Sequence, residues 1–137
     1  MNKSEQTTAD WFAERYRVAP AEVSRRIELA VLGGDWGANG YTTMVQADML
    51  ARELGLRPGV RLLDLGAGRG WPGLYLAAAT GCQVVLADVP VEGLRDAAAR
   101  AHREELAGRA APVAATARVL PFTPGSFDAI VHTDVLC

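Results

Sequence analysis

Three alternating glycines follow a short apolar run in the stretch Leu62–Gly73, LLDLGAGRGWPG. Gly66, Gly68 and Gly70 let the backbone turn tightly and approach a ligand closely, because no Cβ stands in the way. A helix that begins directly after such a loop points its free N–H groups into the same space. We therefore expect the loop from Gly66 to Gly70, including Ala67, to hold a nucleotide-like ligand.

A single carboxylate strengthens this interpretation. Asp88 ends the apolar run CQVVLAD, residues 82–88, and follows the glycine loop by about 20 residues. A carboxylate at that place can accept hydrogen bonds from both hydroxyls of a ribose. The loop and Asp88, with the neighbouring Val89, together predict a site for a nucleoside cofactor.

The loop differs from the dinucleotide fingerprint G-x-G-x-x-G, because Trp71 occupies the place of the third glycine. Asp64, two residues before the first glycine, would oppose a pyrophosphate but attract an ammonium or sulfonium group. These residues favour a positively charged cofactor, and they leave an NAD-dependent oxidoreductase as the weaker alternative.

Apolar periodicity predicts the elements that position these residues. Continuous apolar runs are typical of buried strands, and helical patterns lie between them. The expected strands are 60–65, 82–88, 111–116 and 127–133, and the expected helices between them are 71–80 and 91–108. This alternation predicts an α/β fold with a Rossmann-like open parallel sheet, flanking helices and a ligand at the carboxyl ends of the strands.

The first part of the chain has a different pattern. Helical periodicity is expected at 8–17, 20–32 and 43–54, and the glycine-rich segment 33–43 interrupts it. We divide the single predicted domain into an N-terminal helical extension with a glycine-rich lid segment, 1–56, and a cofactor-binding βαβ half, 57–137.

Three motifs occur in order: an acid followed by G-x-G-x-G at 64–70, the acidic LADVP at 86–90, and ARVLPFTPGSFDAIVHTDVL at 117–136. At these residues the chain resembles the class I S-adenosylmethionine-dependent methyltransferases. The resemblance implies S-adenosylmethionine as the cofactor, S-adenosylhomocysteine as its product, and no required metal.

The same resemblance implies where the cofactor lies. Its amino acid portion is expected near Asp64 and Gly66, its ribose on Asp88, and its adenine beside Thr116 and Ala117. Many relatives have an acid at the position of Thr116, so the hydroxyl here offers a weaker acceptor to the adenine amino group.

The lid segment has its own candidates under this resemblance. Tyr41 and Thr42 are expected to touch the cofactor, and Trp36 is a candidate lid aromatic. Trp71 has two interpretations, either packing at a helix start or forming a wall of the acceptor pocket.

His132 is the candidate catalytic base, because it follows the fourth predicted strand and Asp134 is close enough in sequence to orient it. A structural histidine is the alternative. We expect His102 to be a solvated surface residue and Asp128 to hold backbone at a strand start.

Composition narrows the function classes. The chain has 137 residues and a net charge of -2, without the basic excess that nucleic acids require. It has no apolar run of roughly 20 residues that would span a membrane. Cys82 and Cys137 lack metal-ligand spacing, so we expect packing residues, a reducing cytoplasmic location and no metal site.

Methyl transfer to a small-molecule acceptor is the function that these patterns favour. The family's sheet usually has more strands than the four predicted here, so we expect a truncated sheet that carries mainly the cofactor-binding half. A homodimer contact or a second chain would then cover the edge of the fourth strand. The alternative is a non-catalytic S-adenosylmethionine-binding or assembly module.

Overall fold

The computed structural model describes residues 1–38 and 40–134. Its four strands form one parallel sheet in the order β3-β2-β1-β4, which confirms the α/β, Rossmann-like open sheet. In chain order the elements are α1 (Lys3–Arg17), α2 (Glu22–Leu32), α3 (Met44–Glu53), β1 (Arg61–Leu65), α4 (Gly73–Thr80), β2 (Gln83–Asp88), α5 (Val91–Arg103), β3 (Ala110–Ala114) and β4 (Ala129–Val131).

The sheet register places the chemistry-bearing ends of the strands side by side. Asp64 on β1 pairs with Leu86 on β2 and with Val131 on β4. Asp88, at the end of β2, pairs with Ala114 on β3. Because all neighbours run parallel, the loops that follow the four strands meet along one edge of the sheet.

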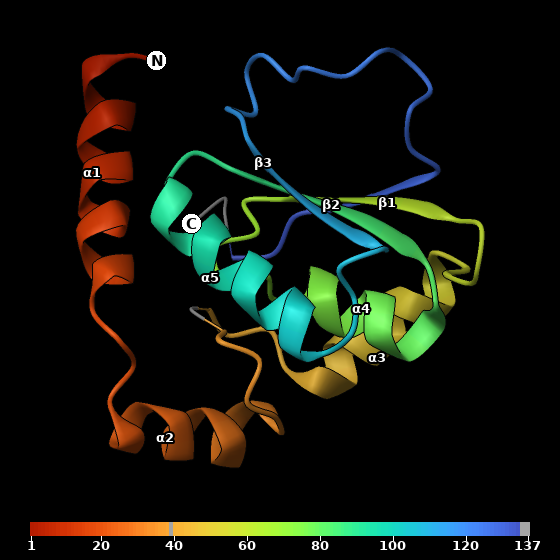
Figure 1. Ribbon diagram of the computed structural model, residues 1–137, viewed down its shortest axis with the longest axis horizontal. Helices are drawn as coiled ribbons and strands as arrows, with labels where there is room; N and C mark the ends of the chain where they lie inside the picture. Colours follow the sequence, from red (N-terminus) through yellow and green to blue (C-terminus); the bar gives the residue numbers. More distant parts are fainter. Residues whose placement is uncertain (39, 135–137) are drawn as a thin grey trace.

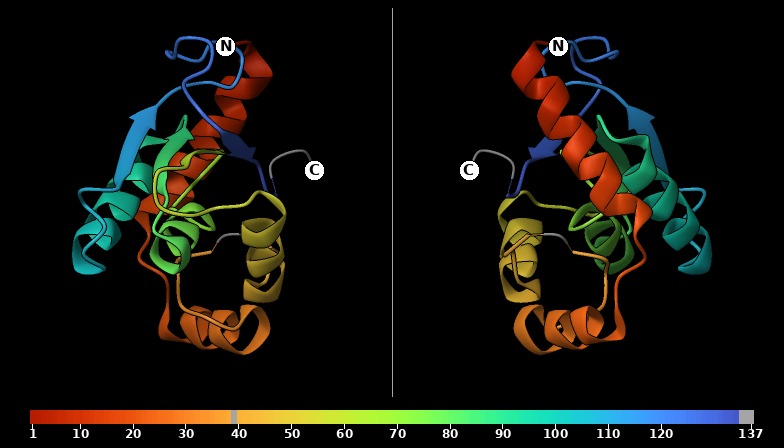
Figure 2. Two further views of the ribbon diagram at one scale, coloured as in Figure 1. Left: turned by 90° about the vertical axis from the view of Figure 1, so that its right-hand side faces the viewer. Right: turned by 90° about the vertical axis from the view of Figure 1, so that its left-hand side faces the viewer.

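Helices α3, α4 and α5 lie on one side of the sheet, and the segment 115–128 arches over the other (Figures 1 and 2). We predicted strands buried on both faces, which is wrong for β3 and β4. Ala111 and Pro112 are exposed, and Ile130 is 54% exposed. Within the described residues no helix covers this second face, so side chains of the outer strands β3 and β4 keep contact with water there, whereas Leu63 of the central strand β1 is 1% exposed.

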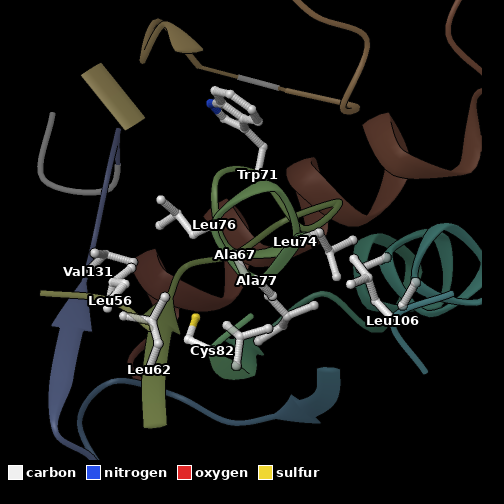
Figure 3. Close-up of a cluster of buried hydrophobic side chains, with 14 of the residues drawn as sticks. Leu56, Leu62, Ala67, Trp71, Leu74, Leu76, Ala77, Cys82, Leu106 and Val131 are labelled. Carbon is white, nitrogen blue, oxygen red and sulfur yellow. The ribbon is translucent and has the colours of Figure 1, made fainter. Parts of the chain in front are cut away.

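The hydrophobic core lies between the sheet and the helices α4 and α5. Leu62, Leu74 and Leu86 are fully buried there, and Figure 3 shows part of this cluster. Each such leucine stabilises the fold by roughly 1.5–3 kcal/mol relative to an exposed side chain. Cys82 is also fully buried, which confirms its packing role, whereas Cys137 lies outside the described residues.

Helix boundaries differ from the expected ones for local reasons. α1 begins at Lys3 rather than residue 8, because Asn2 and Glu5 form a reciprocal capping box at its start. α5 ends at Arg103 rather than residue 108, and Glu105 beyond it has a left-handed φ of 58°.

The N-terminal helix α1 packs against α5 and runs alongside the carboxyl end of the sheet (Figures 1 and 2). Arg17 at its end forms an ion pair with Glu92 of α5 at 3.0 Å. None of the described helices is both long and apolar enough to cross a membrane.

Candidate functional site

The glycine loop has the backbone conformation that its composition predicted. Gly66, Gly68 and Gly70 have positive φ values of 79°, 51° and 98°. The N–H groups of Gly66 and Ala67 both donate to the carbonyl of Ala87, at 2.8 and 3.2 Å. The loop is therefore fastened to the end of β2, where a side chain at any of the three glycines would strain the backbone.

Asp88 holds the loop from the side of β2. Its Oδ2 accepts from the N–H of Gly68 at 2.7 Å, and its Oδ1 accepts from the N–H of Val89 at 2.7 Å. Burial raises the pKa of Asp88, and these two hydrogen bonds partly offset that effect. Each carboxylate oxygen keeps a second lone pair, so the pair can still accept from a ribose diol.

Asp64 lies behind the loop instead of in the cavity. Its side chain is on the same face of β1 as Leu62, toward the helix layer, because alternate residues of a strand share a face. It is 1% exposed, and its Oδ2 accepts from the N–H of Gly73 at 2.8 Å. Burial raises the pKa of Asp64 to about 8, and the negative charge of Asp88 adds to the rise. Asp64 thus fastens the start of α4 beneath the loop.

A cavity of about 650 Å³ opens at the carboxyl ends of the strands. This volume is ordinary for a site that holds a cofactor-sized molecule. The predicted residues that line it are Gly66, Ala67, Gly68, Asp88, Val89, Thr116 and Ala117. Gly70 contributes instead to packing, since a Cβ there would lie 2.5 Å from Leu74 Cδ1 and 3.2 Å from Ala97 Cβ.

Helix α1 forms a wall of this cavity that we did not predict from the sequence. Ala9, Phe12 and Tyr16 line the cavity from one face of the helix, and a Cβ on Gly68 would lie 2.7 Å from Tyr16 Oη. The spacing of these three residues was the available signal, because positions three and four apart share a helix face. No local pattern indicates what that face of the helix packs against.

Arg69 fixes the end of α1 to the loop. Its guanidinium donates to the carbonyls of Tyr16 and Val18 at 3.2 and 2.8 Å, and it forms an ion pair with Asp96 at 2.9 Å. At the other end of the wall, Glu5 pairs with Arg118 beside Thr116 and Ala117. This pair joins residues 113 positions apart, so local sequence patterns could not reveal it.

The packing interpretation of Trp71 is confirmed, whereas a role in the acceptor pocket stays a prediction. Its ring is 7% exposed and packs on Tyr75 with centroids 5.6 Å apart, yet it also lines the cavity. Its indole N–H donates to the carbonyl of Thr42 at 3.0 Å. Trp36 packs on the same tyrosine, with centroids 5.5 Å apart, and is not among the lining residues.

The lid segment reaches the cavity through its glycines. Gly37 and Gly40 line the cavity, whereas Tyr41 is 88% exposed and neither Tyr41 nor Thr42 is part of the wall. Asp134 holds this segment, since its Oδ2 accepts from the N–H groups of Tyr41 and Thr42 at 3.1 and 3.2 Å. Cofactor contacts by Tyr41 and Thr42 stay a prediction.

His132 is exposed and is not among the residues that line the cavity, although Thr133 and Asp134 are. Its catalytic role also stays a prediction.

His102 is exposed, as expected. Asp128 accepts from the N–H of Arg61 at 2.8 Å, which confirms that it holds backbone at a strand start. Among residues 1–38 and 40–134, no three His, Cys, Asp or Glu side chains gather as a metal site.

Residues 62–137 match the family model described as a methyltransferase domain. The chain belongs to the S-adenosylmethionine-dependent methyltransferases. A solved S-adenosylmethionine-dependent methyltransferase from Geobacter sulfurreducens, in complex with S-adenosylhomocysteine, superimposes with a TM-score of 0.53 and 26% identity over 66% of this chain and 36% of that one. The cofactor of this family is therefore S-adenosylmethionine.

Two further relatives are more similar in sequence. The 27-O-demethylrifamycin SV methyltransferase of Amycolatopsis mediterranei is 35% identical over 108 residues, which cover 69% of this chain and 40% of that protein. The [4+2]-cyclase SpnF is 31% identical, with a TM-score of 0.56, over 69% of this chain and 35% of that one. The chain spans from about a quarter to two fifths of the length of the curated relatives it matches.

The described residues fit this cofactor. The glycine loop offers backbone without side chains, and Gly68 contributes its N–H to Asp88 at the cavity wall. Asp88 presents a carboxylate to a ribose. Apolar groups such as Val89 and Ala117 flank the end of the cavity where the adenine ring is expected.

Proposed function

We propose that the chain binds S-adenosylmethionine in the cavity beside α1 and takes part in methyl transfer to a small-molecule acceptor, leaving S-adenosylhomocysteine. The observation that carries this proposal is Asp88. Its carboxylate ends β2, is fixed to the N–H of Gly68, and lines a cavity of about 650 Å³.

The bound sulfonium supplies an already activated methyl group, so the protein has to orient the reactants and exclude water. The glycine loop and Asp88 would fix the ribose and the chain attached to it. Helix α1, through Phe12 and Tyr16, would shield that side of the cofactor from solvent. His132 is our candidate to take a proton from a hydroxyl or amine acceptor, and it would have to reach the acceptor from outside the cavity wall.

A small acceptor is favoured over a nucleic acid by the net charge of -2 and by Trp71, which gives the cavity an apolar wall. The rifamycin methyltransferase relative is named for a small-molecule acceptor.

We place the protein in the cytoplasm on the basis of its cysteine usage. The edge of β4, next to the exposed Ile130, is where a second copy or another chain would pack.

A second function is favoured by one relative. SpnF, at 31% identity, is named as a [4+2]-cyclase although it superimposes on this fold. A protein with this fold thus carries the name of an activity other than methyl transfer, and our alternative for this chain is a non-catalytic S-adenosylmethionine-binding or assembly module. An NAD-dependent oxidoreductase is the least supported function, because the buried Trp71 fills the place of the third glycine.

The two main functions separate in a transfer assay. The 137-residue chain would be incubated with S-adenosylmethionine labelled in the methyl group and with panels of isoprenoid, phenolic and polyketide acceptors. We expect label in an extractable product, and less label from Asp88→Ala at the same concentration of S-adenosylmethionine. Asp128→Ala is the matched control, because Asp128 lies outside the cavity and should leave transfer intact. Cofactor binding without labelled product from any acceptor would support the binding module.

A further inference from the structure

Among the residues that the structure describes, three carboxylates line the cavity: Glu5, Asp88 and Asp134. Glu5 is paired with Arg118 at the adenine end, and Asp88 holds the N–H of Gly68 in the middle. Asp134 lies at the opposite end, after β4, and the proposed function gives it no role. Arg118 is the one lysine, arginine or histidine among the described lining residues. It follows β3, whereas Asp134 follows β4, and these two strands are at opposite ends of the sheet.

The backbone presents Asp134 in an unusual conformation. Its backbone φ is 58°, in the left-handed region that residues other than glycine rarely adopt. Its Oδ2 accepts from the N–H groups of Tyr41 and Thr42 and from the Thr42 hydroxyl at 2.9 Å. A Cβ on Gly40 would overlap this carboxylate, so glycine is required there. The chain thus accepts backbone strain and a tight approach to place one carboxylate at this end of the cavity.

The sheet sets the distance from Asp88 to Asp134. β1 lies between β2 and β4, so two strand spacings, about 10 Å, separate the positions just beyond β2 and β4. A cofactor whose ribose rests on Asp88 and whose adenine points toward β3 must extend its amino acid portion toward β4. That portion carries an α-ammonium group, and the sulfonium lies between it and the ribose.

We propose that Asp134 binds the α-ammonium group of S-adenosylmethionine through a charge-assisted hydrogen bond while it holds the segment 40–42 against the cavity. This inference rests on the proposed cofactor site. Asp64, which we expected to meet this positive charge, is buried behind the loop and bonded to the N–H of Gly73. Asp134 is the lining carboxylate at the end where the charge must lie.

The test compares two ligands that differ only in the portion that Asp134 would bind. S-adenosylhomocysteine carries the amino acid group, and 5′-methylthioadenosine lacks it. Asp134→Asn keeps an oxygen for the donors of the lid segment but removes the charge. In calorimetric titrations we expect Asp134→Asn to weaken S-adenosylhomocysteine by about tenfold or more and to leave 5′-methylthioadenosine within about twofold.

Two variants isolate the other roles of Asp134. Thr42→Val removes the hydroxyl donor of the lid and should change the affinity for both ligands by the same factor. Asp128→Asn makes the same chemical change at the amino end of β4, outside the cavity, and should change neither. Should Asp134→Asn fail to fold, Asp134→Gly replaces it, because glycine accepts the left-handed φ.

Equal weakening of both ligands would overturn the inference, because Asp134 would then serve the lid alone. Unchanged binding of S-adenosylhomocysteine would overturn it as well. If the unaltered chain bound neither ligand, the proposed cofactor site itself would be wrong. That result is distinct from a failure of Asp134 alone.

Discussion

Asp64 and Asp88 are carboxylates on neighbouring strands whose surroundings give them different roles. Burial raises the pKa of both carboxyl groups. Asp88 is partly exposed and lines the cavity, whereas Asp64 is 1% exposed beneath the loop. Of these two residues, only Asp88 can contact a ligand. A substitution of Asp64 should therefore change the free energy of unfolding, and a substitution of Asp88 should change the affinity for the cofactor.

Asp64 makes stability depend on pH. Its pKa rises from an ordinary 3.8 to about 8 in the folded chain, so between these values the folded state keeps a proton that the unfolded state has lost. The stability that this proton provides is present below about pH 4 and is lost as the pH rises to about 8. Asp64→Asn should therefore gain stability over the unaltered chain as the pH rises from 5 to 8, by up to about 1.4 kcal/mol per pH unit.

Urea unfolding of both proteins at pH 5, 6.5 and 8 measures this difference. Asn can still accept from the N–H of Gly73, so the packing beneath the loop is kept. Parallel stability curves for the two proteins would show that Asp64 does not carry the shifted pKa.

Asp88 should contribute to cofactor affinity through the ribose. Asp88→Ala removes two acceptor oxygens from the cavity wall and should weaken S-adenosylhomocysteine binding by about 1–3 kcal/mol. Titration with 5′-methylthioadenosine, which keeps the ribose, should show the same loss, unlike the change at Asp134. Affinity equal to that of Asp128→Ala would remove Asp88 from the site.

Much of the site at this scale could be predicted from the sequence, because the conformation of Gly66, Gly68 and Gly70 is encoded locally. The position of Asp88 could likewise be predicted, because an apolar run marks β2 and Asp88 ends it. The position of Asp64 could not be predicted in the same way. Neighbouring residues of a strand point to opposite faces, so an error of one residue decides whether a side chain faces the cavity or the helix layer. The partners of Asp134 and Glu5 depend on contacts across the chain, which no local pattern reports.

Helix α1 is the element whose role the sequence revealed least. Its periodicity predicted a helix, but its start at Lys3 came from a capping box, and its place beside the cavity came from Arg69 and α5. The strands and the helices α4 and α5 were predicted to within a few residues because apolar runs and glycines mark them. By contrast, α1 has only one buried residue, Tyr16.

Arg69 should control whether α1 stays on the cavity. Its side chain is 12% exposed and joins the carbonyls of Tyr16 and Val18 to Asp96. Arg69→Ala removes the donor that binds both carbonyls, so we expect a loss of about 1–3 kcal/mol and faster tryptic cleavage after Arg15 and Arg17. Limited proteolysis followed by mass spectrometry measures this rate.

Arg95→Ala is the control, because Arg95 is an exposed arginine of α5 and forms no hydrogen bond or ion pair with α1 among residues 1–38 and 40–134. Cleavage of Arg69→Ala at the rate of this control would show that Arg69 does not hold α1 on the cavity.

In the molecule as a whole, helices α3, α4 and α5 cover one face of the sheet, and no described helix covers the other face. The core between the sheet and α4 and α5 fixes the glycine loop and Asp88 in place, so the cofactor cavity depends on the best-packed part of the chain. The open face and the edge of β4, with Ile130 exposed, are where we expect another chain to pack. A light-scattering mass from the ligand-binding sample tests that expectation.

Calorimetric titration of S-adenosylhomocysteine into the 137-residue chain, with NAD as the control ligand, tests the central claim most directly. The cavity and Asp88 predict one site of micromolar affinity, about 8 kcal/mol, for S-adenosylhomocysteine and no measurable binding of NAD. A folded sample that bound NAD in preference, or neither ligand, would contradict the claim that this glycine loop holds a methyl-donor cofactor.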